Sequence, residues 1–456
     1  AKRQEILIGF DTYLNSKNKA SSSPYLKKIL DNGITIVAEK IDTVQSIALG
    51  MFVHSGVIYE SDKMHGVSHF IEHMMFKGTQ KRTAKKIASE FDRIGGVLNA
   101  FTSKDFCCYY ARVVKDKLEK AIDVLGDMIM NSTFPQDEIE RERRVILEEI
   151  KMYEDSPDEI IHELLGSNIW KNAKLGRPIL GTKKTVGAMT RDDIYKVFEE
   201  QYVTGNLQIC IAGNFDWDKL CTLIDKKLAN MRQGTFNHRL HTIKPSADAS
   251  VYVKNMEQVH LTLGTEGVSF KDDRRFALTI MNAAFGGGMS SRLFQEIREK
   301  RGLAYTVYSY HTSLANTGLF GIYAGTSMNQ LPMVLEVCRK EMDRFAEKGI
   351  SARELDATRE QLEGNMLLGL ESMTNRMNRL SMGFLYGIEP LAPEDTIAPY
   401  LAVTTDEVNK LAKELLDEKK LAITLIAPSA EIGPMLKKAG YSDRHIEVLG
   451  AEKLEE

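Results

Sequence analysis

Two kinds of apolar pattern alternate along the first half of the chain. Short runs rich in β-branched and apolar residues predict buried strands, whereas apolar residues at helical spacing predict helices. Strands are expected at residues 33–38 and 46–53 and, as a pair, at 97–114. Helices are expected at residues 67–77, 83–94 and 116–130, and a long one begins at Pro135. Ser68 is expected to cap the first helix and Gly78 to end it.

The second half repeats the order of elements of the first half. A strand at 319–324, a helix at 329–346 and a long helix from Ala352 follow at an offset of about 216 residues. We therefore expect an α+β protein with two homologous α/β domains, each a largely antiparallel sheet flanked by helices. The expected segments are an N-terminal extension (1–24), a first domain (25–231), a linker (232–250), a second domain (251–440) and a C-terminal tail (441–456).

The composition is ordinary for a globular protein and argues against several classes of function. With 60 Lys and Arg against 63 Asp and Glu, the net charge is -3, which does not favour nucleic acid as a partner. No apolar stretch approaches the roughly 20 residues that span a bilayer, and the first residues lack the pattern of a secretory signal. The five cysteines form no CxxC motif, which favours a reducing compartment.

Two histidines four residues apart lie in the first predicted helix. In the run His69-Phe70-Ile71-Glu72-His73 the two imidazoles share one helix face. Glu72 lies about 100° of arc from His73 and about 60° from His69, so it reaches the same face. Neutral imidazole is a common zinc ligand. The pattern indicates a metal site with an acid beside it. Two surface histidines on a solvated helix would give the same sequence pattern.

A third ligand is needed, because catalytic zinc normally has three from the protein. The long helix carries an apolar stripe formed by Ile139, Ile146, Ile150 and Tyr153. Glu142 and Glu149 fall inside or at the border of this stripe, where a carboxylate needs a cation or hydrogen bonds. A metal would compensate such a charge, and Glu142 could instead hold a ligand imidazole through its other N–H. Ion-paired carboxylates on a solvated helix remain the alternative.

These residues belong to a wider resemblance to the inverted zinc-peptidase family. This family comprises the pitrilysin and insulinase-type enzymes, including the mitochondrial processing peptidases and their bacterial homologues. It carries a reversed HxxEH motif, in contrast to the commoner HExxH. The resemblance covers about residues 25 to 430, and the matching segments are residues 65–79, 95–103, 140–143, 148–150 and 175–181.

The resemblance implies one zinc ion per chain, with His69, His73 and Glu149 as its ligands. Family spacing favours Glu149 over the adjacent Glu148. The resemblance also implies that Glu72 is the general base and that Glu142 is a supporting acid.

Two further parts of the site are implied by the same resemblance. Leu98, Asn99, Ala100 and Phe101 resemble the family's edge strand, to which the substrate backbone adds as an extra strand. In the second half, Arg298 and Tyr305 match an Arg and a Tyr that reach across to the substrate carbonyl and stabilise the oxyanion.

The second copy lacks the metal chemistry. At the offset of the repeat, position 142 falls on Thr358 and position 149 on Asn365, and no His pair precedes them. We therefore expect a degenerate second domain that completes the active site. A flexible span at 232–250 would permit the two halves to close on each other.

The resemblance implies a zinc metalloendopeptidase that hydrolyses peptides or unfolded segments inside a clamshell. It implies a homodimer, or a heterodimer with an inactive homologue. It favours a bacterial-like cytoplasmic protein, with the mitochondrial matrix as the alternative. Two other hypotheses stay open: a catalytic subunit that is active only with a non-catalytic partner, and a metal-binding scaffold without hydrolysis.

One late signal is interpreted as packing. Met373, Met377 and Met382 recur at helical spacing in the second half and are expected in a core, since methionine fills irregular apolar gaps.

Overall fold

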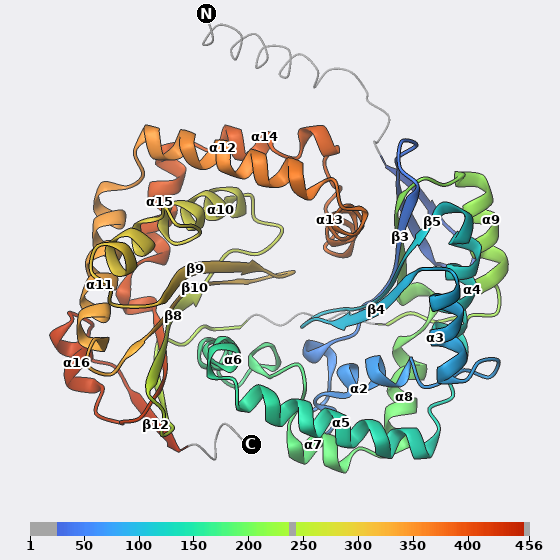
Figure 1. Cartoon of the computed structure of the whole chain (residues 1–456), viewed down its shortest axis with the longest axis horizontal. Helices are drawn as coiled ribbons and strands as arrows, with labels where there is room; N and C mark the ends of the chain where they lie inside the picture. The colour runs from blue at the N-terminus through green and yellow to red at the C-terminus, as the bar shows by residue number, and fades with distance from the viewer. Residues whose placement is uncertain (1–24, 237–242, 451–456) are drawn as a thin grey trace, which may run out of the picture.

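The computed structural model describes residues 25–236 and 243–450, and these form two α/β halves (Figure 1). Each half contains one six-stranded sheet with helices packed against it. The first half lies on the right of Figure 1 and the second on the left. The expected fold class, two α/β domains of similar build, is confirmed. The predicted extension at 1–24 lies outside the described residues.

The first sheet is mixed. Its strands are β1 (Leu26–Ile29), β2 (Thr35–Lys40), β3 (Ser46–Val53), β4 (Val97–Thr102), β5 (Cys107–Val114) and β6 (Leu207–Gly213). They lie in the order β1-β2-β6-β3-β5-β4. The pair β2–β6 is parallel, and the other neighbours are antiparallel. β4 therefore forms one edge of the sheet.

The second sheet repeats this strand arrangement at five of its six positions, and only the outermost strand differs. Its strands are β7 (Ala249–Val253), β8 (Gln258–Glu266), β9 (Thr306–Ser313), β10 (Gly318–Ser327), β11 (Ala422–Ala427) and β12 (Ile446–Gly450). The order is β12-β7-β11-β8-β10-β9, so β9 occupies the edge that β4 occupies in the first sheet.

The outermost strand differs between the sheets. β1 pairs antiparallel with β2, whereas β12 comes from the end of the chain and pairs parallel with β7. The segment 441–456, expected to be a tail, thus contributes a strand to the second sheet. The expected linker at 232–250 reaches into β7, and its residues 237–242 lie outside the described part of the chain.

Alternate residues of β3 face two different cores. Leu49 and Met51 point into the main core of the first half, whereas Phe52 points to the opposite side of the sheet. There it meets α13 (Met373–Leu385), a helix of the second half, which buries Met377 in the same cluster. Because both faces of the sheet are covered at β3, the sequence of this strand is a continuous apolar run rather than an alternation of apolar and polar residues.

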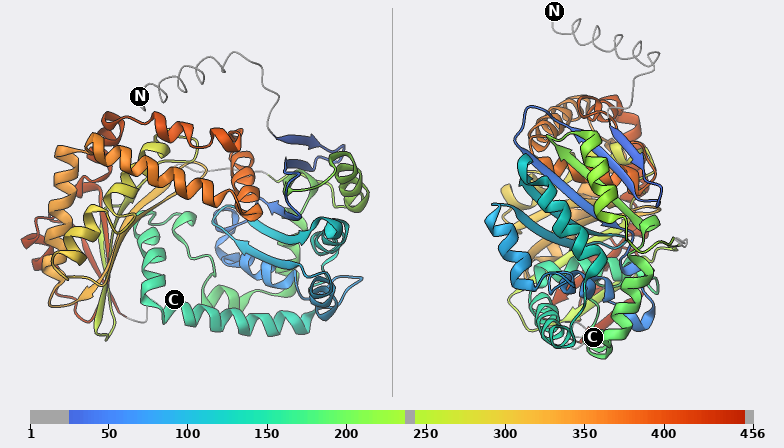
Figure 2. Two further views of the ribbon diagram at one scale, coloured as in Figure 1. Left: turned by 45° about the horizontal axis from the view of Figure 1, so that its top comes forward. Right: turned by 90° about the vertical axis from the view of Figure 1, so that its right-hand side faces the viewer.

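The two halves exchange one helix each. α13 packs on β2, β3 and β6 of the first sheet, while α6 (Pro157–Ile169) of the first half packs on β8 and β11 of the second sheet. Buried Glu39 of β2 forms ion pairs with Arg376 and Arg379 of α13. The side-chain amide of Asn168 in α6 donates to the backbone oxygen of Ile423 in β11. Figure 2 shows helices of the second half reaching across to the first sheet.

The other helices include the six that were predicted, at residues 67–77, 83–94, 116–130 and 329–346 and from 135 and 352, with shifted ends, and several that were not predicted. In the first half they are α2 (Val67–Met74), α3 (Ala84–Arg93), α4 (Leu118–Asn131), α5 (Gln136–Glu154), α7 (Lys183–Ala188), α8 (Arg191–Gln201) and α9 (Trp217–Leu228). In the second half they are α10 (Arg274–Phe285), α11 (Leu331–Lys348), α12 (Ala352–Gly369), α14 (Ala398–Ala402), α15 (Thr405–Leu415) and α16 (Gly433–Lys438).

The helix α2 is shorter than expected and begins differently. Gly66, with φ 92°, is its N-cap. Ser68 lies inside the helix, so the prediction that its side chain caps α2 is wrong. Gly78 lies beyond the end of the helix, which stops at Met74. The N–H groups of Gly66 and Ser68 are instead bound by the carboxylate of Glu60, which the chain brings back from a preceding loop.

Two further expectations concern the whole chain. The five cysteines are free thiols and all are buried, consistent with the interpretation that they form no disulfide framework. Among the residues described here, no helix has both the length and the apolar character needed to cross a bilayer.

Candidate metal centre

The candidate site lies where α2 packs against α5, next to the edge strand β4. α2 presents His69 and His73 on one face, with ring centroids 4.6 Å apart. α5 brings Glu142 and Glu149 to the same place. Glu142 is buried within the apolar stripe of α5, and the Glu149 side chain lies at its border with 43% exposure. The adjacent rival Glu148 is exposed.

Three side chains converge on one point. The ligand atoms of His69, His73 and Glu149 all lie within 4.8 Å of one another. Oε2 of Glu149 is 3.4 Å from Nε2 of His73 and 3.7 Å from Nε2 of His69. Zinc bonds of about 2.0–2.1 Å in a tetrahedron would place neighbouring ligand atoms about 3.4 Å apart. The two distances to Glu149 therefore fit a zinc ion held by these three side chains.

The electrostatics of the three groups suit a divalent cation. Burial and the neighbouring His73 lower the pKa of His69 to about 4, so its imidazole is neutral at neutral pH. Burial opposes a charge on His73 as well, but hydrogen bonds to Glu149 and Glu142 outweigh it and raise the pKa of His73. The hydrogen bond from His73 is in turn the main cause of the lowered pKa of Glu149. A metal ion would take the place of the proton that Glu149 holds at Nε2 of His73.

Glu142 orients His73 from the side away from Glu149. Its Oε2 lies 3.0 Å from Nδ1 of His73, and its Oε1 lies 2.7 Å from Nζ of Lys77. Because Nδ1 serves as the donor to Glu142, Nε2 is left to face Glu149. Lys77 compensates the buried carboxylate. Lys77 was not predicted as a site residue, although it follows His73 by four residues.

Glu72 lies beside the two histidines and is held by the edge strand. The hydroxyl of Thr102, at the end of β4, donates to Oε2 of Glu72 at 2.5 Å. Burial raises the pKa of Glu72, and the Thr102 hydrogen bond acts against this rise. Thr102 was not predicted as a site residue. Its position directly after Phe101, in the segment that resembles the family's edge strand, was the available signal.

The residues expected to bind substrate, Leu98 to Phe101, lie on this open edge of the first sheet. β4 pairs with β5 on one side, and in the described strand order it has no neighbour on the other. Oδ1 of Asn99 accepts the backbone N–H of Ala100 at 2.8 Å. An edge strand of this kind offers N–H and C=O groups to an added strand.

Arg298 and Tyr305 lie in the second half. Arg298 belongs to a π-helical turn (Phe294–Glu299), and Tyr305 directly precedes the edge strand β9. The guanidinium of Arg298 lies 4.9 Å from the centroid of the Tyr305 ring, which belongs to a residue that is 78% exposed. The structure brings these two residues together, but within its described part no hydrogen bond or ion pair joins either of them to the metal centre.

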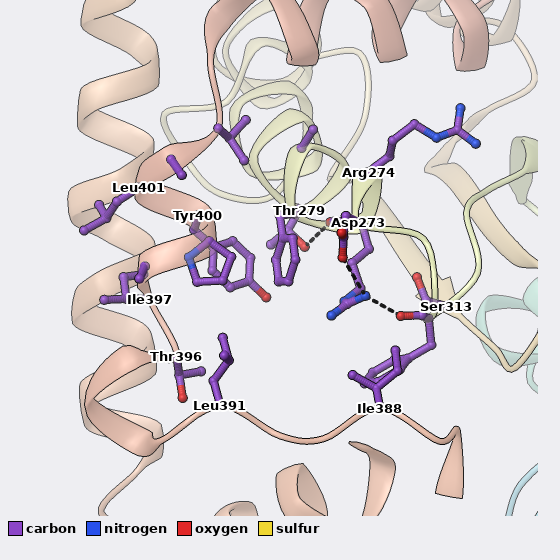
Figure 3. A pocket seen from close by; sticks show the side chains of 18 of the residues that line it. Asp273, Arg274, Thr279, Ser313, Ile388, Leu391, Thr396, Ile397, Tyr400 and Leu401 are labelled. Carbon is purple, nitrogen blue, oxygen red and sulfur yellow. Dashed lines mark hydrogen bonds and ion pairs between the residues drawn. The ribbon is translucent and has the colours of Figure 1, made fainter. Parts of the chain in front are cut away.

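A cavity of about 1660 Å³ lies apart from this centre, in the second half (Figure 3). It lies between the first half of α10, which carries Thr279, and a segment that carries Leu391 and Tyr400. None of the candidate metal ligands is among its described lining residues. The cavity is therefore not the space in front of the three converging side chains.

Some known proteins are similar to this chain in sequence, and others are similar to it in fold. An uncharacterized zinc protease of Bacillus subtilis, YmxG, is 39% identical over 406 residues, which are 88% of this chain and 98% of that protein. An uncharacterized zinc protease of Streptomyces coelicolor is 39% identical over 409 residues, which are 88% of each chain. The crystal structure of a protease from Helicobacter pylori has a TM-score of 0.82, with 20% identity and coverage of 89% of this chain and 100% of that one. At that identity the likeness concerns the fold alone.

Two family models match the chain in succession. The model described as insulinase (peptidase family M16) matches residues 35–183, and the model described as peptidase M16 inactive domain matches residues 188–362. The fold defines a class of proteins built from two α/β halves of similar strand order. The chain belongs to the insulinase family of peptidases, family M16, which confirms the resemblance drawn from the sequence.

Proposed function

We propose that this protein is a zinc-dependent endopeptidase with one zinc ion per chain. The observation that carries the proposal is the convergence of His69, His73 and Glu149 within 4.8 Å, with Glu72 next to them on the same helix. The relatives named as zinc proteases support it. His69, His73 and Glu149 would hold the metal, and Glu142 would hold His73 in the tautomer that presents Nε2.

The chain's own residues supply the proton chemistry. Zinc, when bound, polarises a carbonyl and makes water more acidic. Glu72 accepts a proton from the attacking water at its carboxylate and passes it to the leaving amine. The hydroxyl of Thr102 keeps that carboxylate in position through its hydrogen bond to Oε2.

The substrate is a peptide or an unfolded segment that adds to β4 as a further strand. Leu98 to Phe101 would supply backbone hydrogen bonds, which recognise extended chains with little regard to their side chains. Arg298 and Tyr305 would donate to the oxyanion once the second half, or a partner, closes over the substrate. The exposure of Tyr305 supports a role that begins only in the closed state.

We propose that the enzyme works as a homodimer that encloses a chamber. A heterodimer with an inactive homologue is the second candidate, favoured by the match of residues 188–362 to a domain described as inactive. The free and buried cysteines support a reducing compartment, either a bacterial cytoplasm or the mitochondrial matrix.

The test combines metal analysis with peptide-library cleavage for the wild-type chain and for Glu72→Gln. A peptidase of this kind holds one zinc per chain in both proteins and loses cleavage by about 100- to 10,000-fold in the variant. A scaffold would bind zinc but cleave nothing in either form. Cleavage that appears only after a homologous partner is added would identify a catalytic subunit of a heterodimer.

A further inference from the structure

The two candidate ligand histidines are positioned in different ways. Nδ1 of His73 is bound by the carboxylate of Glu142. Nδ1 of His69 is buried and, among the described residues, has no hydrogen-bond partner. Among the described residues, the imidazole of His69 therefore lacks a hydrogen bond like the one by which Glu142 orients the imidazole of His73. Its direction must come from the backbone turn that carries it and from the packing around it.

That backbone turn is bound by a carboxylate from outside the helix. Glu60 is 2% exposed. Its Oε2 accepts the N–H of Gly66 at 2.8 Å, and its Oε1 accepts the N–H of Ser68 at 2.9 Å. Ser68 directly precedes His69, so one carboxylate spans the first turn of α2 up to the ligand. The N–H groups at the start of a helix have no partner within the helix and carry partial positive charge, which an anion stabilises.

The same turn is confined by close backbone contacts. Gly66 has φ 92°, and a Cβ at this residue would lie 2.7 Å from Cα of Gly181 and from the oxygen of Leu180. A ring nitrogen of His65 lies 2.7 Å from the backbone oxygen of Pro178. The entry to α2 thus rests against the segment 178–181, while Glu60 binds the N–H groups of the first turn itself. Rotation or translation of this turn would break contacts on both sides.

We propose that Glu60 is a positioning residue of the metal centre, which fixes the first turn of α2 and through it the imidazole of His69. The role is the backbone counterpart of the one that Glu142 plays for His73. This inference rests on the proposed function, since it assumes that His69 holds the metal. Within the described part of the chain no hydrogen bond joins Glu60 to a candidate ligand side chain, and its effect passes through the peptide units of residues 66–69.

The experiment measures zinc affinity of the folded protein by competition with a chelator, for the wild type and for Glu60→Gln. A glutamine has one acceptor oxygen and cannot bind both N–H groups, so the dissociation constant is expected to rise about tenfold or more, as for partners of metal ligands in general. The cobalt-substituted protein should show a changed visible spectrum, because the coordination geometry is altered. KM should stay near the wild-type value while kcat falls, since β4 is untouched.

A matched control separates positioning from general stability. Glu418 in the second half is also a buried carboxylate, which accepts the backbone N–H of Ser442 at 3.0 Å and pairs with Arg444 at 2.9 Å. Glu418→Gln should lower the melting temperature and leave the zinc affinity unchanged. If Glu60→Gln fails to fold, Glu60→Asp replaces it, because it keeps the charge but is too short to span both N–H groups.

Two results would overturn the inference. If Glu60→Gln, or Glu60→Asp in its place, lowers the melting temperature as Glu418→Gln does but keeps the wild-type zinc affinity and cobalt spectrum, the residue only stabilises the fold. If the wild-type chain itself binds no zinc, the proposed function fails and the inference fails with it. A wild type that binds zinc and cleaves peptides, beside a Glu60 variant with unchanged affinity, overturns the inference alone.

Discussion

The two halves of the chain share one architecture but bury different residues at equivalent places. α2 packs on α5 in the first half, and α10 packs on α12 in the second. Where α5 buries Glu142, α12 buries Thr358 at the repeat offset, and the place of Glu149 is taken by the exposed Asn365.

This difference shows which buried residues the fold requires and which only the site requires. α10 contains neither histidine nor an acidic residue, yet the second half builds the same sheet order. A buried carboxylate is far more costly to desolvate than a hydroxyl and requires partners such as His73 and Lys77. The scaffold therefore folds without these charges, and we infer that the first half keeps them for the metal.

The largest effect is expected at Glu149, where the halves differ most. Glu149→Gln removes the proposed anionic ligand, so zinc should be lost and peptide cleavage should fall by about 1000-fold or more. Metal content by atomic absorption and cleavage of a peptide library measure the two quantities. Asn365→Ala, the equivalent change in the second half, should alter neither. A Glu149→Gln protein with full zinc content would show that another group is the third ligand.

A smaller effect is expected at Glu142. Glu142→Gln weakens the hold on His73 and leaves Lys77 without its carboxylate, so zinc affinity should fall about 10- to 100-fold. Chelator competition measures this. The control is Thr358→Val, which changes the equivalent buried position and should leave zinc affinity at the wild-type value. If both variants lost zinc affinity equally, the effect of Glu142 would come from the general stability of the fold and not from its contact with His73.

Thr102 tests whether the first sheet takes part in the chemistry. Thr102→Val removes the hydrogen bond to Glu72, and kcat should fall about tenfold, a fraction of what a general base contributes. Zinc content should be unchanged, because none of the candidate ligands contacts this hydroxyl in the described structure. Thr102→Ser keeps the hydroxyl and should restore most of the rate. A Thr102→Val enzyme with wild-type kcat would leave Glu72 positioned by packing alone.

The smallest effect on catalysis is expected from the contacts that join the halves. Glu39→Gln weakens the hold of α13 on the first sheet, and Asn168→Ala weakens that of α6 on the second. Each should lower the free energy of unfolding by about 1–3 kcal/mol, as for a lost buried hydrogen bond or ion pair. Denaturant unfolding followed by fluorescence and circular dichroism should remain a single transition in both. Two separate transitions would show that each half is stable without the helix of the other.

Much of the local structure could be predicted from the sequence. The apolar run at 46–53 marks β3 at both ends, and Pro135 immediately precedes α5. The spacing of His69 and His73 put them on one helix face. The apolar stripe of the long helix left Glu142 and Glu149 as candidates, and the family resemblance chose Glu149 as the third ligand. These inferences work because helical periodicity and ligand chemistry depend on residue type and on neighbours along the chain.

Three contacts of the site were not predicted, and each has the same cause. Ser68 was expected to cap α2, but Glu60 binds the N–H of that residue instead. Thr102 meets Glu72, and Lys77 meets Glu142. A polar side chain in a sequence has many candidate partners, and the choice among them depends on how the loops and strands pack.

The sequence by itself determined many of the elements and the internal duplication, since these follow from patterns that repeat over a few residues or over one fixed offset. Its resemblance to a known family supplied the full set of candidate metal ligands. The tertiary structure alone decided that α6 of the first half would cover the second sheet and that α13 of the second half would cover the first sheet. It alone decided which carboxylate would bind the first turn of α2. Such contacts join segments far apart in the chain, and their pairing depends on the shape and burial of surfaces that exist only after folding.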